Sequence, residues 1–461
     1  MKVLKFDGTS VGSAPCILRV KQIVDSTKEP VVVVVSALGG ITDLLIQTAQ
    51  VAAKGDEAYL NHFDQIATRH HDLVNEAFTD AHKKLLLHAE IDTLLAELRS
   101  LLQGVRLIKN LPHSALSTIL SYGERLSVCI VTSLLKNAVA YDALDMIKTK
   151  KVDDTTHVLD ANYTLRIVRE MLHDDILSHR GRFVAVVAGF IATDSQSGEI
   201  TTLGRGGSDY TASLIAAALE ADTLELWTNS DGFMSADPAL VPSATLIEKM
   251  TYNEAFEMCN FGSDIIYPPT LYPVLQKKIP IHIRNIFHPD HRGTVISHKA
   301  PAGRRLIKGI TSISDISLVT VSGPMMVGVA GFSRRIFTTL ADHGINVIFI
   351  SQASSEVSVT IGVSTAHGRK AQQLLNMAFS NERIMGAMLP ATLENDFAIV
   401  AVVGDKMQKR AGTAGKLFTL LGRNDINIKA FAQGASERNI SFVVSGDQLQ
   451  KTVEIIHDNM V

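Results

Sequence analysis

Cysteine, aromatic residues and excess charge are all scarce in this sequence. The 461 residues include three cysteines, one tryptophan and 6% aromatic residues, and the formal net charge at pH 7 is −3. Cys16, Cys129 and Cys259 are odd in number, far apart and without metal-ligand spacing, which favours reduced thiols over disulfides or a zinc site. The small net charge gives no electrostatic reason to expect nucleic acid or an anionic membrane as a partner.

Long apolar runs are missing as well. The longest, around Val31–Val35 and Phe183–Ile191, are too short to span a bilayer. The first residues resemble a strand directly, without the charged leader and apolar stretch of a signal peptide. These absences predict a cytoplasmic protein. A composition of 46% hydrophobic and 20% charged residues over this length predicts more than one globular domain.

Short apolar runs alternate with helix-period segments over residues 1–297. Runs such as Val31–Val35 and Thr223–Trp227 are typical of buried strands in a largely parallel sheet. Segments such as Ile41–Ala53 have helical periodicity. The alternation predicts an α/β domain with helices on both faces of the sheet. Proline and glycine around Pro301–Gly303 indicate a boundary near residue 298.

The remainder contains an internal repeat with a constant offset of 81 positions, as from Asn346 to Asn427. The matched residues are Gly344–Val347 with Asp425–Ile428, Gln352 with Gln433, and Ser355-Glu356 with Ser436-Glu437. Each copy has the pattern of a helix, a turn, a strand and a second, alternating strand. The sequence therefore predicts two copies of a small βαββαβ unit, at 298–390 with its linker and at 391–461, which may share strands.

The segment Lys5–Gly12 is a predicted strand that runs into a glycine-containing turn and a helix. Backbone N–H groups at such a helix start form an anion site, and Lys5 adds a positive charge for a phosphoryl group. A plain capped helix is the alternative interpretation.

The segment Thr201–Ala212 places three glycines around Arg205 just before an apolar helix. Glycine lets a backbone approach a ligand closely, and Ser208 and Asp209 lie where the helix is expected to begin. The alternative is that Asp209 only caps the helix and Arg205 is a surface charge.

The segment Ser121–Ser127 lies inside a predicted amphipathic helix and contains Gly123 beside Glu124 and Arg125. Glycine costs helix stability, so the close approach of a ligand or of a neighbouring backbone would account for it. A solvent-facing Glu–Arg pair is the alternative.

Together these segments resemble the signature motifs of aspartokinases. Lys5–Ser10 resembles their Lys-Phe-Gly-Gly-Thr-Ser motif, Ser121–Ser127 their Ser-x-Gly-Glu-Arg-Leu-Ser motif, and Leu203–Tyr210 their Leu-Gly-Arg-Gly-Gly-Ser-Asp-Tyr motif. Ser36-Ala37 with Gly40–Asp43 is similar to their second substrate loop. The repeat resembles their paired ACT domains, which sense amino acids.

The resemblance covers essentially the whole chain. It is greatest to the kinase and sensor portion of threonine-type bifunctional aspartokinase/homoserine dehydrogenases, without a dehydrogenase dinucleotide motif. It implies an amino-acid kinase α/β/α sandwich followed by two ferredoxin-like ACT domains. The implied activity is ATP- and Mg²⁺-dependent phosphorylation of L-aspartate to 4-phospho-L-aspartate, for lysine, threonine and methionine synthesis, under feedback control.

The resemblance also implies roles for individual residues. The catalytic group is Lys5 at the transferring phosphoryl, Arg205 at an aspartate carboxylate, Glu124 at the substrate ammonium, and Asp209, which orients the reacting groups or Lys5. The other substrate residues are Ser36, Thr42, Phe190 and Ser208. The nucleotide residues are Gly8, Thr9, Ser10, Thr228, Asn229 and Asp231.

Four residues depart from the family pattern on the nucleotide side, namely Asp7, Asn229, Ala239 and Asp264. Asp7 stands in place of a glycine beside the phosphate turn, and Asp264 in place of a lysine that reaches ATP. The added negative charge predicts weaker ATP binding. The alternative function is therefore an amino-acid-sensing regulatory protein with a kinase fold that binds ATP weakly or not at all, as a partner of an active paralogue. A kinase for another carboxylate is a third reading that the repeat disfavours.

Each copy of the repeat contains an asparagine and a glutamine, at Asn346 and Gln352 and at Asn427 and Gln433. Side-chain amides donate and accept hydrogen bonds, which suits an amino-acid effector. The alternative is that the asparagines cap turns and the glutamines lie on the surface. The resemblance implies threonine or lysine as the effector, and a homodimer or higher homo-oligomer formed through the ACT domains.

Overall fold

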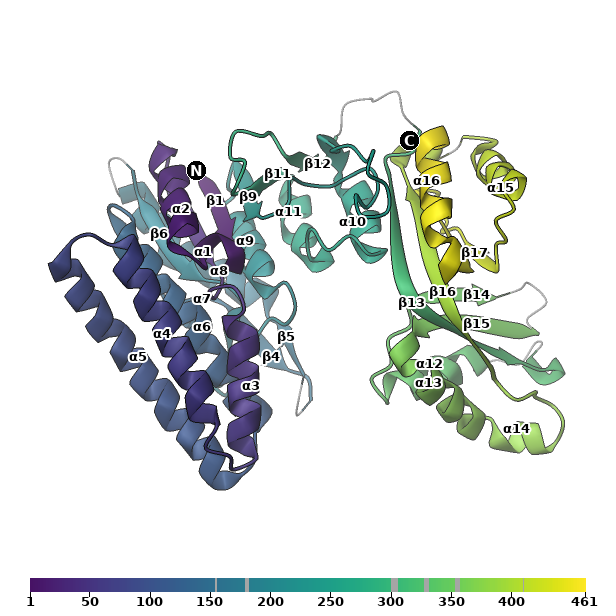
Figure 1. Cartoon of the computed structure of the whole chain (residues 1–461), viewed down its shortest axis with the longest axis horizontal. Coiled ribbons are helices and arrows are strands. Elements are labelled where there is room, and N and C mark those ends of the chain that lie inside the picture. The colour runs from purple at the N-terminus through teal and green to yellow at the C-terminus, as the bar shows by residue number, and fades with distance from the viewer. Residues whose placement is uncertain (154–155, 179–181, 300–305, 327–330, 353–356, 409) are drawn as a thin grey trace. The chain divides into compact units, whose positions relative to one another are not determined.

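The structure is a computed structural model, and it describes the chain except residues 154–155, 179–181, 300–305, 327–330, 353–356 and 409 (Figure 1). Pro301–Gly303, Ser355 and Glu356 therefore lie outside the described residues. The chain divides into two compact units. The first contains Met1–Phe233, Glu248–Tyr252 and Ile265–Ala300, and the second contains Met234–Ile247, Asn253–Asp264 and Pro301–Val461.

The first unit is built on an eight-stranded sheet of order β10-β12-β11-β9-β1-β2-β6-β3. The strands are β1 (Lys2–Phe6), β2 (Val31–Val35), β3 (Ala138–Tyr141), β6 (Val184–Ala188), β9 (Thr223–Thr228), β10 (Lys249–Thr251), β11 (Ile281–Asn285) and β12 (Thr294–Ser297). All neighbours pair in parallel except β11 with β12. The five valines of β2 are at most 1% exposed, as expected for a strand covered on both faces.

Helices surround this sheet. They are α1 (Gly8–Val11), α2 (Ala14–Ser26), α3 (Ile41–Ala53), α4 (Tyr59–Ala77), α5 (Ala81–Ile108), α6 (His113–Leu134), α7 (Ala143–Met146), α8 (Ala161–Ser178), α9 (Gly207–Ala218) and α11 (Leu271–Lys277). A smaller sheet has the order β5-β4-β7-β8. Its strands are β4 (Lys148–Lys151), β5 (His157–Leu159), β7 (Ile191–Asp194) and β8 (Ile200–Thr202). Figure 1 shows α3 to α6 gathered as a bundle. The predicted α/β fold is confirmed.

The second unit is built on a six-stranded antiparallel sheet of order β14-β15-β13-β16-β18-β17. The strands are β13 (Gly309–Ser322), β14 (Phe349–Gln352), β15 (Ser358–Ser364), β16 (Thr392–Val403), β17 (Ala430–Ala432) and β18 (Asn439–Ser445). The helices are α10 (Tyr252–Asn260), α12 (Phe332–Ala341), α13 (Thr365–Ala378), α14 (Ser380–Ile384), α15 (Thr413–Arg423) and α16 (Leu449–Met460), with Tyr252 counted in the first unit. The two copies of the repeat meet where β13 pairs with β16.

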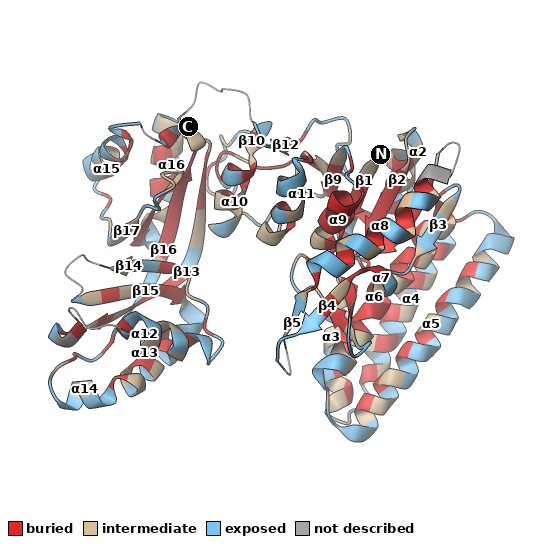
Figure 2. Cartoon of the chain, turned by 180° about the vertical axis from the view of Figure 1, so that it is seen from behind, coloured by how far each residue is buried: buried red, intermediate tan, exposed pale blue. Residues whose placement is uncertain are grey.

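Each copy of the repeat has its own core. One gathers apolar side chains from β13, β15, α12 and α13, and the other from β16, β18, α15 and α16. Figure 2 shows the central strands of both large sheets as largely buried. None of the described helices is long and apolar enough to cross a membrane.

Candidate active site

The residues assigned to substrates lie mainly at one edge of the eight-stranded sheet. Strands β1, β2, β6 and β9 run parallel, so their carboxyl ends meet at that edge. Asp7 follows β1, Ser36 follows β2, Phe190 closely follows β6, and Asn229 follows β9. In open α/β sheets the carboxyl edge is where ligands bind, because loops from several strands converge there.

Lys5 and Asp209 form an ion pair at this edge. Lys5 is near the end of β1 and is 9% exposed, while Asp209 lies in the first turn of α9. The Lys5 Nζ atom is 2.6 Å from a carboxylate oxygen of Asp209. A largely buried cation needs such a partner, and the carboxylate also fixes where the ammonium group points. The contact is the one expected if Asp209 organises Lys5.

The start of α9 packs closely against other segments of the same chain. Gly206 has a φ of 67°, and a Cβ on it would lie 2.2 Å from Cβ of Tyr267. A Cβ on Gly189 would lie 2.5 Å from Cβ of Ser208. The close approach that these glycines permit is therefore made at least partly to the protein itself, which fixes the buried Ser208 at the edge.

Phe190 has a left-handed backbone conformation, with a φ of 69°. Its N–H donates to the hydroxyl oxygen of Thr211 at 3.2 Å, and its carbonyl accepts from the N–H of Leu203 at 2.8 Å. Such a conformation in a non-glycine residue costs free energy and persists where neighbours enforce it. Arg205 lies beyond Leu203 as an exposed residue between two left-handed glycines.

Glu124 is buried in α6 and is 3% exposed. The Ala37 N–H donates to its Oε1 atom at 3.2 Å, and its Oε2 atom has no hydrogen-bond partner among the described residues. Burial raises the pKa of Glu124 from 4.5 to about 8, because a lone carboxylate is poorly stabilised away from water. The interpretation of Glu124 as a solvent-facing residue is therefore wrong.

Gly123 is explained by the same contact. A Cβ on it would lie 2.8 Å from Cβ of Ala37. The glycine lets α6 approach the loop after β2, and this approach brings Glu124 to the Ala37 N–H. Ser36 and Thr42, at the two ends of that loop, are half-buried. The structure thus groups Glu124 with the predicted second substrate loop.

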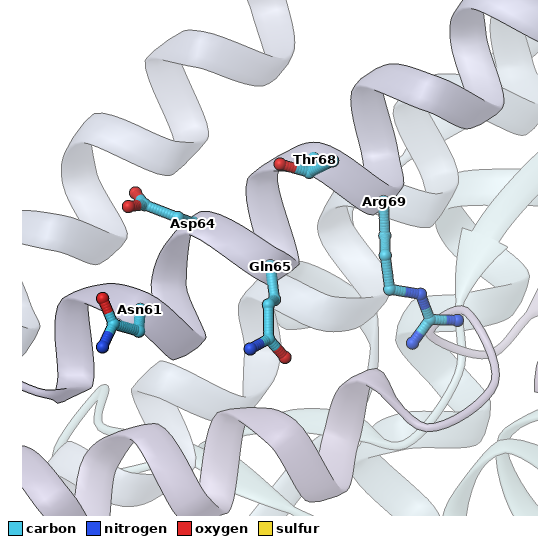
Figure 3. A pocket seen from close by; sticks show the side chains of 5 residues that line it. All are labelled: Asn61, Asp64, Gln65, Thr68 and Arg69. Carbon is cyan, nitrogen blue, oxygen red and sulfur yellow. The ribbon is translucent and has the colours of Figure 1, made fainter.

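Arg69 supports this loop, and sequence reasoning missed it. A hollow of about 380 Å³ runs along α4, lined by Asn61, Asp64, Gln65, Thr68 and Arg69 (Figure 3). In Figure 3 the Arg69 side chain extends towards a loop, and its Nη2 donates to the carbonyl of Gly39 at 2.7 Å. Nothing in the sequence around Arg69 pairs it with Gly39.

Asp7 occupies the donors of the predicted phosphate turn. Its Oδ1 atom accepts from the Ser10 N–H at 2.8 Å, from the Ser10 hydroxyl at 2.6 Å and from the Thr9 hydroxyl at 2.9 Å. The carboxylate thereby caps α1. Gly8 packs closely, since its carbonyl accepts from the Gly39 N–H at 2.8 Å. The alternative of a capped helix describes this arrangement.

The predicted nucleotide loop follows β9. Thr228 ends that strand, and its hydroxyl donates to Oδ1 of Asn229 at 3.3 Å. Asp231 accepts from Nδ2 of Asn285 at 2.7 Å and contacts Nδ1 of His288 at 3.1 Å. The hydrogen bond to His288, and then that to Asn285, lowers the pKa of Asp231. Sequence reasoning missed both partners, although Asn285 ends the strand beside β9.

Ala239 and Asp264 belong to the second compact unit, and both are exposed. The Ala239 N–H donates to a carboxylate oxygen of Asp237 at 2.9 Å, so Ala239 lies in a turn. The proposed place of these two residues at ATP stays a prediction.

The four sensor residues Asn346, Gln352, Asn427 and Gln433 are all exposed. Gln433 lines a cavity of about 370 Å³, together with Glu437 and the start of α15 at Gly412–Gly415. Asn427 is not among the residues that line it. In the first copy, residues 327–330 and 353–356 include some of the positions that correspond in sequence to the lining of this cavity, and they lie outside the described residues.

Two known family models match most of the chain. Residues 1–285 match the model of the amino acid kinase family, and residues 319–379 and 400–460 match that of an ACT domain. The chain belongs to the amino acid kinase family. Within this family its relatives are aspartokinases, which confirms the resemblance drawn from the motifs and the repeat.

The relatives of this chain align with nearly its whole length. The bifunctional aspartokinase/homoserine dehydrogenase of Haemophilus influenzae is 32% identical over 461 residues, which cover 99% of this chain and 56% of that protein. Aspartokinase 1, chloroplastic, of Arabidopsis thaliana is 28% identical, with 99% of this chain and 79% of that protein covered. The chain thus spans about half the length of the bifunctional relatives.

Solved structures give the same affiliation. E. coli aspartokinase III in complex with aspartate and ADP matches 100% of this chain and 99% of its own, with a TM-score of 0.81 and 27% identity. The aspartate kinase of Clostridium acetobutylicum matches 100% of both chains, with a TM-score of 0.80 and 26% identity. The order of the two parts in this chain is therefore that of the solved aspartokinase chains.

Proposed function

We propose that this chain phosphorylates the β-carboxylate of L-aspartate with ATP, forming 4-phospho-L-aspartate. The observation that carries the proposal is the Lys5–Asp209 ion pair of 2.6 Å at the carboxyl edge of the parallel sheet. It holds a largely buried ammonium group at the edge where the loops that we assign to aspartate and to the nucleotide converge. Phosphoryl transfer depends mainly on positioning and on neutralising the negative charge of the transferring group, and a fixed lysine contributes to both.

The substrate ammonium is assigned to Glu124. Its Oε2 atom is buried and lacks a partner among the described residues, and its pKa is raised to about 8. A cation beside that oxygen would stabilise the ionised carboxylate and bring the pKa down. L-aspartate supplies such a cation, and the structure of the E. coli relative was determined with aspartate bound.

The substrate carboxylates are assigned to Arg205 and to the hydroxyl groups nearby. An arginine binds a carboxylate through two parallel hydrogen bonds. Ser36, Thr42 and Ser208 would donate further bonds, and Phe190 would cover the apolar part of the substrate. Mg²⁺ bound to the ATP phosphates would supply additional positive charge.

A second candidate function is an amino-acid-sensing regulatory protein that binds ATP weakly or not at all. The specific observation in its favour is that Asp7 already takes the Ser10 N–H and the hydroxyls of Thr9 and Ser10. Those groups are the ones assigned to phosphate. Any nucleotide has to displace a carboxylate from them as well as approach its charge.

Control is assigned to the ACT pair. The cavity at Gln433 is lined by the start of α15 at Gly412–Gly415, by Glu437 and by Arg410. N–H groups at a helix start suit a carboxylate, and Glu437 suits an ammonium, so the lining fits an amino acid. We propose threonine or lysine as the effector, with a homodimer formed through the ACT units.

The activity is tested with purified chain, L-aspartate, ATP and Mg²⁺, trapping the acyl phosphate as its hydroxamate. Arg205→Ala should lower kcat/KM for aspartate about 10- to 150-fold, the loss of a charged hydrogen-bond pair worth roughly 1.5–3 kcal/mol. The matched control is Arg166→Ala, which removes an exposed arginine that pairs with Glu170 on α8. Hydroxamate formation that is equal in both variants would contradict the assignment of Arg205. No hydroxamate from the parent chain would favour the sensing function.

A further inference from the structure

The loops after β9 and β11 bring an aspartate and two histidines together. Nδ1 of His288 lies 3.1 Å from Oδ1 of Asp231, and the rings of His288 and His291 have centroids 5.3 Å apart. One ligand atom from each of the three side chains can be chosen such that all lie within 4.8 Å of one another. All three residues belong to the first compact unit.

The backbone presents the two imidazoles from one turn. The His288 N–H donates to the carbonyl of Asn285 at 3.2 Å, and the His291 N–H donates to the carbonyl of His288 at 3.0 Å. Nη2 of Arg284 holds the carbonyl of Pro289 at 2.7 Å. The turn that carries both histidines is therefore fastened to the end of β11 by hydrogen bonds that involve neither imidazole.

The carboxylate is fixed as well. Nδ2 of Asn285 donates to Oδ1 of Asp231 at 2.7 Å, and the Asn285 Oδ1 accepts from the Phe287 N–H at 2.8 Å. The asparagine thus orients Asp231 from within the same turn. Groups that hydrogen-bond to a metal ligand and set its orientation are a regular part of metal sites.

We propose that Asp231, His288 and His291 bind one divalent transition-metal ion, with Zn²⁺ as the representative. Two imidazoles and one carboxylate suit zinc, cobalt or nickel, whereas Mg²⁺ prefers oxygen ligands alone. Ligand distances of about 2.0–2.2 Å place ligand atoms roughly 3.3–3.5 Å apart around a tetrahedral ion. Both histidines are exposed, so their side chains can close that difference by rotation. A fourth position stays open to water.

A simple ion pair explains less of the arrangement. The direct contact of His288 with Asp231 joins two of the three residues, whereas His291 acts on Asp231 only through a longer-range charge interaction. The two imidazole rings lie beside one another, with centroids 5.3 Å apart and planes tilted by 38°. A metal ion uses both rings in their neutral form and joins them to the carboxylate.

The site would join the loop after β9 to the loop after β11. Asp231 cannot serve a metal ion fully and contact a nucleotide as well, so metal binding and nucleotide binding would be coupled through one carboxylate. The metal site itself is independent of the proposed kinase activity, because all its ligands come from the chain.

The test uses the full chain without a histidine tag, stripped with a chelator and dialysed. Zn²⁺ is titrated by calorimetry, and Co²⁺ is followed by its visible absorption, which reports ligand geometry. His288→Ala and His291→Ala should each weaken Zn²⁺ binding by at least about tenfold. Removing a residue that only hydrogen-bonds to a metal ligand already lowers metal affinity by about that factor. Mg²⁺ at millimolar concentration should not displace Co²⁺.

Two controls separate this site from other histidines. His113→Ala removes an exposed histidine at the start of α6. His88→Ala breaks a second close histidine pair, in which Nδ1 of His71 lies 2.7 Å from Nδ1 of His88. Both variants should bind one Zn²⁺ like the parent. No stoichiometric binding by the parent, equal binding in His291→Ala, or loss confined to His88→Ala would each overturn the proposal. None of these readouts depends on aspartate or ATP.

Discussion

At the scale of single residues, Asp7 already takes the hydrogen-bond donors of the turn that we assign to phosphate. Its charge was visible in the sequence, but its three hydrogen bonds to Thr9 and Ser10 were not. The Asp7 side chain could point into the site or turn back to cap its own helix, depending on its rotamer. The sequence does not determine which rotamer it adopts. Glu124 was found from its motif, whereas its burial and its raised pKa follow from packing around Ala37.

Two replacements of Asp7 separate the effect of its negative charge from the effect of its hydrogen bonds to Thr9 and Ser10. Asp7→Gly frees the donors and removes the anion, so ADP should bind at least about tenfold more tightly, which corresponds to roughly 1.4 kcal/mol. Asp7→Asn removes the charge but keeps an acceptor for the Ser10 N–H, so its gain should be smaller. Asp64→Asn, on the exposed face of α4, is the control for net charge. Calorimetry with Mg-ADP measures all four proteins. Equal affinity of Asp7→Gly and the parent would show that Asp7 does not limit nucleotide binding.

At the scale of elements, periodicity and glycine placement predicted strands and helices well but not their neighbours. Gly206 was assigned to the approach of a ligand, and its close contact proves to be Tyr267. The sequence did not reveal Asn285 and His288 as partners of Asp231, because about 50 residues separate β9 from β11 in the chain. The two strands are neighbours only in the folded sheet. Contacts between strands that are distant in sequence leave no local pattern.

The effector cavity is formed by elements of the second repeat. If threonine or lysine binds at Gln433 and at the start of α15, the ligand should raise the unfolding temperature of the chain, because it binds the folded state alone. Gln433→Ala should reduce that shift. Gln450→Ala, which removes an exposed glutamine in the first turn of α16, serves as the control. Thermal unfolding with threonine, lysine and methionine measures this. An unchanged shift in Gln433→Ala would place the effector elsewhere. No shift of the parent with any of the three amino acids would contradict the proposal that one of them is the effector.

At the scale of the whole molecule, the sequence predicted a kinase part and a duplicated sensor part. It did not indicate that Met234–Ile247 and Asn253–Asp264 group with the second unit. The reason is packing, since Ala236 and Val241 join the core formed by β16, β18 and α15. The repeat itself was readable because its register is constant, and each copy contributes three strands to one sheet.

The central claim is that L-aspartate binds this chain with its ammonium on Glu124. Free Glu124, with a pKa of about 8, is mostly protonated at pH 7. The substrate ammonium would lower that pKa, so binding should release protons at pH 7 and affinity should rise as the pH approaches 8. Glu124→Gln keeps the shape but has no proton to release.

Calorimetric titration of L-aspartate at pH 7, in two buffers of different ionisation enthalpy, measures this proton directly. The parent should release protons on binding aspartate, and Glu124→Gln should bind more weakly and release none. Binding by the parent without proton release, or the same release in Glu124→Gln, would contradict the placement of the substrate.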